Sequence, residues 1–245
     1  MIRAFALQTC RPLRRGAMKS CYHKDELFLF TIACRTADVN TTRPGKGCEF
    51  MLERCLSLLI GYLCGSILTA DLLTRQKSKT DIRQLGSGNP GAANVALQLG
   101  PGWGLLVLLG DVGKTMLACL MCRFLLFPEL GGLAVLYAGL GAVLGHNWPL
   151  WTRFQGGKGV AALCTLSVLY LPAAGAVTIG LMLLVCAVSH RLSIGAAAIG
   201  PAFLLVAVCL RRPAEDCLLA AAIALAMLAR SLIALLKEKK MHSGR

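Results

Sequence analysis

The sequence is poor in charged residues. Asp, Glu, Lys and Arg make up 16% of its 245 residues, whereas a soluble domain carries about a quarter. Hydrophobic residues account for 56%, and the mean hydropathy is +0.64. Long blocks of the chain hold almost no charge, which is typical of segments whose solvent is a lipid bilayer. The composition therefore excludes an ordinary soluble domain and predicts an all-α, polytopic integral membrane protein.

Acidic residues are especially scarce. The chain has 12 Asp and Glu against 26 Lys and Arg, a formal net charge of +14. A nucleic-acid-binding surface would interleave aromatic side chains with its basic residues, and this chain does not. The basic residues fall in short connections between apolar segments, where they set membrane topology and meet anionic lipids or phosphorylated substrates. We expect membrane lipids, and no nucleic acid, as partners.

Several familiar catalytic and metal-binding patterns are absent from the sequence. It contains no G-x-x-x-x-G-K-[ST], no H-E-x-x-H and no H-x-x-x-x-D, since no aspartate stands at the required place after His146. Cys119 and Cys122 form a C-x-x-C, but in an apolar helix without a second ligand pair. There cysteine acts as a small hydrophobe. We predict no metal site and no cofactor, and a nucleophile-plus-base mechanism has little support.

The chain changes in character near residue 50. Residues 1–50 hold nine Lys and Arg, show no helical or alternating period, and contain one short apolar run, Leu27–Ala33. That run is too short to cross a bilayer. We expect residues 1–50 to be a disordered extension or the product of an upstream start. The membrane domain is expected to occupy residues 51–245.

About seven membrane-spanning helices are predicted after residue 50. Several of the apolar segments are short for a hydrocarbon core of ~30 Å, so these helices are expected to tilt or to stop midway. Pro172 separates two of them, because proline interrupts helical hydrogen bonding. The segments are approximately 55–73, 103–127, 130–145, 159–170, 172–188, 194–210 and 216–236.

Basic residues gather in alternate connections. They lie in residues 74–102, 146–158 and 189–193 and in the C-terminal tail, while the other connections are nearly uncharged or balanced. The positive-inside rule places the basic connections and the C-terminus on the cytoplasmic side of the cell membrane.

The first long basic connection contains a glycine-rich turn. Three glycines, a proline and two asparagines fall between Gly86 and Asn94. Such a turn reaches positive φ and is able to point several N–H groups into one concavity, which holds anions. Ser87 and Asn89 would add side-chain donors, as would Asn94. An ordinary surface turn is the alternative.

The second basic connection ends in Gly156-Gly157-Lys158-Gly159 where a helix is predicted to begin. A helix N-terminus offers unpaired N–H groups and a partial positive charge, glycines allow close approach, and lysine adds a full charge. Together these features favour a phosphate-binding site, although Lys158 alone is also explained as a topology-setting charge. His146, at the start of this connection, is either a general base or a structural residue.

Asp111 and Lys114 lie inside an apolar segment. A spacing of three puts both side chains on one helix face. A charged pair at this depth is costly unless its members are used or buried together. A structural ion pair and a pair that supports the site are both open.

Three stretches resemble the acyl-phosphate-dependent glycerol-3-phosphate acyltransferase family, PlsY, of bacterial inner membranes. They are Gly86–Val95, the G-D-V-x-K run Gly110–Lys114, and Gly145–Val160 with its G-H-x-x-P and G-G-K-G-V patterns. The resemblance covers about residues 52–236. It implies transfer of a fatty acyl group from acyl phosphate to the 1-hydroxyl of glycerol 3-phosphate, giving lysophosphatidic acid and phosphate.

The resemblance also implies roles for individual residues. The expected catalytic residues are Lys158, Ser87 and Asn89. The expected substrate-binding residues are Gly88, Asn94, Gly156, Gly157 and Ser193, and the supporting residues are Asp111, Lys114 and His146. Because acyl phosphate is already activated, orientation and charge stabilisation suffice, with a substrate phosphate oxygen accepting the hydroxyl proton.

The sequence departs from the family pattern in several places, including the run Ser189–Ser193, where only the serine of a T-R-Y-x-S pattern is kept, and at four single positions. Ala93 and Leu97 stand in place of a threonine and an arginine, and Ala229 and Leu232 in place of a histidine and an asparagine. These changes are expected to leave one side of the site apolar. The alternatives are a relative that binds phosphorylated lipid or a partner without turnover, and a small transporter with a polar cavity near Asp111.

Overall fold

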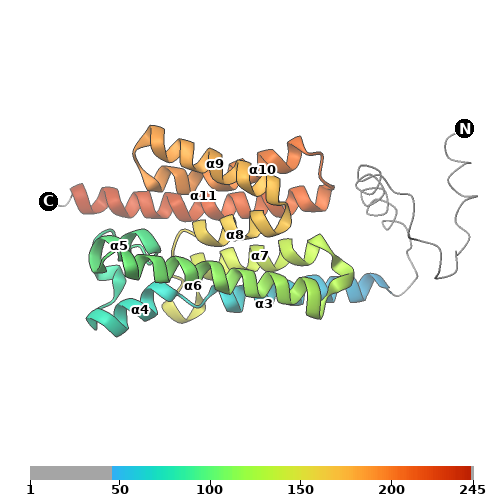
Figure 1. Ribbon diagram of the computed structural model, residues 1–245, viewed down its shortest axis with the longest axis horizontal. Helices are drawn as coiled ribbons and strands as arrows, with labels where there is room; N and C mark the ends of the chain where they lie inside the picture. Colours follow the sequence, from blue (N-terminus) through green and yellow to red (C-terminus); the bar gives the residue numbers. More distant parts are fainter. Residues whose placement is uncertain (1–45, 244–245) are drawn as a thin grey trace, which may run out of the picture. The chain divides into compact units, whose positions relative to one another are not determined.

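The computed structural model describes residues 46–243, and all regular structure in this range is helical. The predicted extension at residues 1–50 lies outside the described residues apart from residues 46–50, which already belong to the first helix. The helices, labelled in Figure 1, are α3 (Lys46–Gly65), α4 (Thr69–Ser78), α5 (Ala92–Leu99), α6 (Pro101–Leu120), α7 (Gly132–Asn147), α8 (Val160–Tyr170), α9 (Pro172–Ser189), α10 (Leu192–Cys209) and α11 (Ala214–Ser243).

Each of the seven predicted segments corresponds to a helix, which confirms the all-helical membrane fold. The first segment differs most, because α3 ends at Gly65 and α4 begins only at Thr69. Helix α5 was not predicted, and α6 continues into a π-helical turn, Met121–Leu126. In the described part of the chain, five helical stretches are long and apolar enough to cross a membrane, and Val160–Tyr170 is apolar but shorter. These five are Phe50–Ser78, Pro101–Leu126, Pro172–Ser189, Leu192–Cys209 and Ala214–Leu236.

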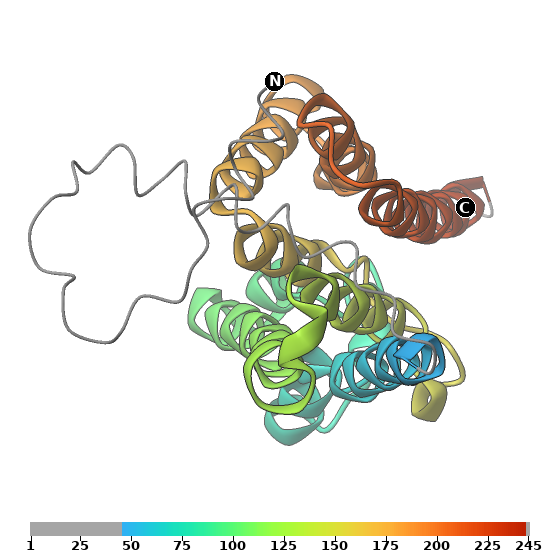
Figure 2. The ribbon, with the colours of Figure 1, turned by 90° about the vertical axis from the view of Figure 1, so that its right-hand side faces the viewer.

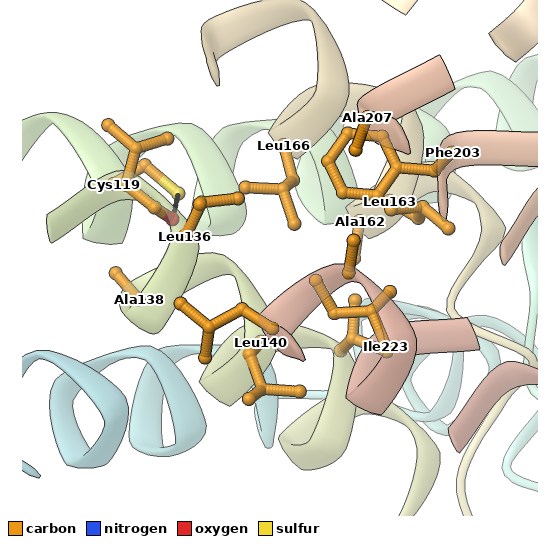
Figure 3. Packing of buried hydrophobic residues seen from close by; sticks show 14 of the residues in the cluster. Cys119, Leu136, Ala138, Leu140, Ala162, Leu163, Leu166, Phe203, Ala207 and Ile223 are labelled. Carbon is orange, nitrogen blue, oxygen red and sulfur yellow. Dashed lines mark hydrogen bonds between the residues drawn. The ribbon is translucent and has the colours of Figure 1, made fainter. Parts of the chain in front are cut away.

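Helix α8 lies in the middle of the bundle, with α6 and α7 on one side and α9 and α10 on the other (Figures 1 and 2). Its buried Leu163 and Leu166 join the main apolar core together with Leu136 of α7 and Phe203 of α10 (Figure 3). Because its neighbours cover it, α8 needs little contact with lipid. This explains how an 11-residue helix is tolerated within a membrane domain.

The two ends of the bundle differ in character. We call the end that carries residues 66–68, 79–91, 148–159 and 190–191 the site end, and the opposite end the far end.

Two polar clusters hold the helices together at the far end. Tyr170 at the end of α8 donates a hydrogen bond to Asp216, and Arg212 donates to the Tyr170 oxygen at 2.8 Å. Arg54 of α3 pairs with Glu215 of α11 at 2.7 Å. Short as it is, α8 therefore reaches the far end.

Helices α3 and α7 pack with their backbones in contact. Each carries two glycines spaced four apart, Gly61 and Gly65 on α3 and Gly141 and Gly145 on α7. A Cβ atom added to Gly141 would lie 2.1 Å from the carbonyl oxygen of Leu58. Moving an apolar helix surface out of lipid yields little free energy, so the association of such helices depends on van der Waals contact between closely packed small residues.

We expect Gly141→Ala to lower the free energy of unfolding by about 1–3 kcal/mol, because the added methyl group forces α3 and α7 apart. The measurement is reversible unfolding in detergent micelles. Gly180→Ala is the matched control: a Cβ at this position of α9 meets nothing within 4 Å. It should be neutral or slightly stabilising. Equal losses in the two variants would contradict the close packing.

Candidate functional site

A cavity of about 990 Å³ opens at the site end, and we call it the large cavity. It collects residues that lie more than a hundred positions apart in the sequence. The predicted site residues that line it are Ser87, Asn89, Asn94, Asp111, His146, Lys158 and Ser193. The rest of the wall is mostly apolar and includes Leu97, Leu108, Val112, Val160, Cys164, Met182, Leu192 and Leu235.

Three helix N-termini face the large cavity. The first residues of α5, α8 and α10 all line it, and in none of these helices does a side chain cap the first N–H groups. Each N-terminus carries a partial positive charge of about half an elementary charge. Lys158 and Arg191 add two full charges, and Asp111 is the one acidic residue in the lining. This end of the cavity is therefore suited to anions.

The glycine-rich turn and the Gly-Gly-Lys-Gly loop touch each other. A Cβ atom on Gly157 would lie 3.0 Å from the carbonyl oxygen of Pro90. Arg83 adds a second link, since its Nε and Nη2 donate to the Gln155 carbonyl oxygen at 2.9 and 2.8 Å. Both loops line the large cavity, so residues about seventy positions apart in the sequence lie along one cavity wall.

The expected nest of N–H groups in the glycine-rich turn is wrong. The Ser87 N–H donates to Asn94 Oδ1 at 3.1 Å, and the Gly88 N–H donates to the Leu85 carbonyl oxygen at 2.9 Å. The Asn89 N–H faces Ser87 Oγ at 3.5 Å, and Asn94 Nδ2 donates back to Leu85. The N–H groups of Ser87, Gly88 and Asn89 are therefore directed to partners within the turn. What it offers to a ligand is the side chains of Ser87 and Asn89, while buried Asn94 braces the turn.

Gly156 and Gly157 also differ from expectation. Their N–H groups donate to the carbonyl oxygens of Asn147 at 3.2 Å and His146 at 3.0 Å, at the end of α7. A Cβ atom on Gly156 would lie 2.0 Å from the His146 carbonyl oxygen. These glycines allow the loop to pack against α7, and their N–H groups are occupied. Gly159, at φ +74°, then turns the chain into α8.

Lys158 and Ser193 are in direct contact. Lys158 Nζ donates to Ser193 Oγ at 2.5 Å, which joins the start of α8 to the first turn of α10. The sequence selected both residues from separate motifs. The structure places their polar atoms together on the wall of the large cavity.

Asp111, Lys114 and His146 form one buried cluster. Lys114 Nζ lies 2.8 Å from Asp111 Oδ1 and donates to His146 Nδ1 at 3.1 Å and to the Ile67 carbonyl oxygen at 2.6 Å. Since lysine is only a donor, Nδ1 is the acceptor, and a neutral His146 ring carries its proton on Nε2. Asp111 and Lys114 form a buried ion pair, and Asp111 and His146 also line the large cavity. A structural role of the ion pair is therefore compatible with a role in supporting the site.

Two arginines of the site were missed at the sequence level. Arg83 was interpreted only as a topology-setting charge, but it also binds Asp71 at 3.1 Å and Asp81 at 2.9 Å. Burial acts to raise the pKa of Asp81, but hydrogen bonds from Arg83 outweigh it and the pKa is lowered. Arg230 donates to the Gly157 carbonyl oxygen at 2.8 Å and also to that of Gly156. The signal for Arg230 was a single charge inside a long apolar segment.

The four departures from the family pattern fall into two pairs. Ala93 and Leu97 line the large cavity, as expected. Ala229 and Leu232 do not line it, and Leu232 is 56% exposed on the outer face of α11. The expectation that all four border the cavity is therefore wrong for the second pair.

We expect Lys114→Met to lower the free energy of unfolding by about 3–5 kcal/mol, because it leaves the Asp111 carboxylate buried without its cation. Unfolding in detergent measures the loss. The double variant Lys114→Met, Asp111→Leu should recover much of it, since neither charge then stays buried. Strictly additive losses would show that the two side chains do not depend on each other.

Comparisons with known proteins identify the relatives of this chain. The glycerol-3-phosphate acyltransferase family profile matches residues 55–239. Glycerol-3-phosphate acyltransferase 1 of Lactobacillus acidophilus is 39% identical over 143 residues, which cover 58% of this chain and 68% of that protein. The Pseudomonas aeruginosa glycerol-3-phosphate acyltransferase is 44% identical over 119 residues, which cover 48% and 61% of the two chains. The chain thus spans about two thirds of the length of these relatives.

Solved structures agree with the sequence matches. The fold is similar to the crystal structure of PlsY (YgiH), an integral membrane glycerol 3-phosphate acyltransferase, in its glycerol 3-phosphate form. The TM-score is 0.67 at 26% identity, and the match covers 78% of this chain and 93% of the other. The lysophosphatidic acid form of PlsY gives a TM-score of 0.64 at 25% identity. This chain belongs to the glycerol-3-phosphate acyltransferase (PlsY) family of integral membrane proteins.

Proposed function

We propose that this chain transfers a fatty acyl group from acyl phosphate to the 1-hydroxyl of glycerol 3-phosphate, giving lysophosphatidic acid and inorganic phosphate. Its family consists of membrane acyltransferases that acylate glycerol 3-phosphate in phospholipid synthesis. The observation that carries the proposal is the convergence of three uncapped helix N-termini and Lys158 on one cavity with an apolar wall. Both substrates carry phosphate groups, and the donor also carries a fatty chain.

The proposed reaction needs no protein nucleophile. The hydroxyl oxygen of glycerol 3-phosphate attacks the carbonyl carbon of acyl phosphate, the bond from that carbon to the phosphate oxygen breaks, and phosphate leaves with the bonding electrons. A phosphate oxygen accepts the hydroxyl proton. The protein contributes by orienting the two substrates and by stabilising the negative charge on the leaving phosphate. Lys158 and the N-terminus of α8 are the groups best placed for this task.

We assign the other lining residues either to the phosphate group or to the fatty chain of the acyl donor. Ser87 and Asn89 contribute the polar side chains nearest to the N-terminus of α5, and Ser193 contributes its hydroxyl beside Lys158. The apolar wall formed by residues such as Leu108 and Met182 suits the fatty chain. Gly88 acts indirectly, because its φ of +66° lets the turn close.

We further propose that the site end faces the cytoplasm of a bacterial inner membrane. Most charges at this end are basic, whereas two of the arginines at the far end are paired with acidic residues, in the pairs Arg54–Glu215 and Arg212–Asp216. Under the positive-inside rule, this excess fixes the orientation of the bundle. Glycerol 3-phosphate, a soluble metabolite, would then reach the cavity from the cytoplasm.

We expect Lys158→Ala to lower turnover about a hundredfold, the usual scale for loss of one electrostatic contact in a transition state. Lys158→Arg should recover little, because a planar fork does not replace a compact point charge. The assay supplies acyl phosphate and glycerol 3-phosphate to purified protein, with acyl-CoA as a donor control. Lys79→Gln, an exposed lysine outside the cavity lining, is the matched control and should retain full activity.

Binding without turnover is the second candidate function, and the apolar residues Ala93 and Leu97 on the cavity wall favour it. If the unmodified chain consumes no acyl phosphate, a variant carrying Leu97→Arg and Ala93→Thr decides between an impaired enzyme and a binding protein. Activity gained by this variant would identify an impaired enzyme. Inactivity of every variant would contradict acyl transfer and favour binding without turnover over an impaired enzyme.

Orientation is tested by single cysteines in a chain whose own cysteines have been replaced. We expect Ser87→Cys to be protected from an impermeant thiol reagent in intact cells and labelled after the membrane is opened. Glu129→Cys, exposed at the far end, should be labelled in intact cells. Labelling of position 87 from outside would overturn the proposed orientation.

A further inference from the structure

Arg230 is an isolated charge within α11. It is the one charged residue between Asp216 and Lys237, and it is only 7% exposed. A charged side chain in a membrane helix costs free energy, so its presence points to a functional role, and its partners indicate which role. None of the described carboxylates pairs with Arg230, and its hydrogen bonds go to backbone carbonyl oxygens. Arg230 is therefore a buried cation whose hydrogen-bond acceptors are two backbone carbonyl oxygens.

These peptide groups belong to the loop that leads into Lys158. Three successive carbonyl oxygens, those of residues 155, 156 and 157, accept hydrogen bonds from arginines. Arg83 binds the first, and Arg230 binds the second and third. On the opposite side, the N–H groups of Gly156 and Gly157 are held by the end of α7. The segment is therefore fixed from both sides just before Lys158.

The two arginines lie behind the glycine-rich turn. They line a second, smaller cavity of about 230 Å³, whose wall also includes Ser87 and Asn89. Ser87 and Asn89 line the large cavity as well, so the turn separates the arginines from the proposed reaction site. Arg230 is not in the lining of the large cavity, so any effect that it has on a substrate there would pass through the loop.

We propose that Arg230 is a positioning residue for acyl transfer. Its guanidinium group binds the Gly156 and Gly157 carbonyl oxygens together and so fixes Lys158 and the N-terminus of α8 against the large cavity. A planar fork binds two neighbouring carbonyl oxygens at once, and a lysine ammonium group does not provide this geometry. The inference rests on the proposed function, since the residue it positions is the one assigned to the reaction.

Steady-state kinetics of Arg230→Met and Arg230→Lys test the proposal. We expect kcat/KM to fall about a hundredfold in Arg230→Met, because small displacements of a catalytic group have effects of this size. Arg230→Lys, which keeps the charge, should recover less than a tenth of the loss. The matched control is Arg212→Met at the far end of the bundle, where the same change should leave kcat/KM within about twofold while lowering thermal stability.

A double variant separates positioning from general damage to the fold. If Arg230 acts through Lys158, then Arg230→Met should have little further effect in a Lys158→Ala background, because effects of residues that act as a unit are not additive. A full additional hundredfold loss in the double variant would overturn the proposal. So would an Arg230→Met protein with unchanged kcat/KM.

Hydrogen exchange supplies a readout that does not depend on activity. In Arg230→Met, the amides of residues 155–159 should exchange at least tenfold faster, while those in the middle of α7 stay protected. Unchanged exchange in this loop would refute the positioning role. If the unmodified chain fails to consume acyl phosphate, the proposed reaction is wrong, and the exchange result alone decides whether Arg230 holds the loop.

Discussion

Inside a bilayer, every backbone N–H and C=O group has to find its partner within the protein, because lipid offers none. Helices meet this condition by themselves, and at several points where the chain leaves the helical conformation at the site end, side chains bind the backbone carbonyl oxygens. Lys114 binds the carbonyl oxygen of Ile67 in the break between α3 and α4, and Trp151 Nε1 binds that of Ser66 at 2.9 Å. Asn94 performs the same task for Leu85. Arg83 and Arg230 do so for the loop before Lys158.

This constraint explains why the site contains so many polar residues of which so few are available to a ligand. Asn94, Lys114, Arg83 and Arg230 are occupied by the backbone, and Asp111 is occupied by Lys114. The large cavity is also lined by short side chains, by Arg191, by Lys158, which is hydrogen-bonded to Ser193, and by the ends of three helices. Under the proposed function, a phosphorylated substrate would be bound largely by the N-termini of these three helices.

The sequence predicted most of the fold because apolar segments and loop charges are local signals. The seven predicted segments overlap helices, the first of them both α3 and α4, and Lys158 lines the same cavity as Ser87 and Asn89. What escaped prediction depends on contacts between distant segments. The break after Gly65 is stabilised by Lys114, 47 positions away, and the Gly156 N–H is taken by Asn147. The GxxxG spacing at Gly61 and Gly141 was visible in the sequence, but which helix faces which was not. Glycine-rich turns were misread because their composition does not tell whether the N–H groups point inward or outward.

The length of α8 has a consequence for where chemistry takes place. Its 11 residues rise about 16 Å, roughly half of a hydrocarbon layer of ~30 Å. One end is held at the far end of the bundle by Tyr170, so in a bilayer that the bundle spans, the other end, with its partial positive charge, would lie below the membrane surface. The large cavity next to this end would then open within the depth of the bilayer. Under the proposed function, a lipid-soluble acyl donor would reach this cavity from within the membrane and glycerol 3-phosphate would reach it from the water, so that each substrate would arrive from its own solvent.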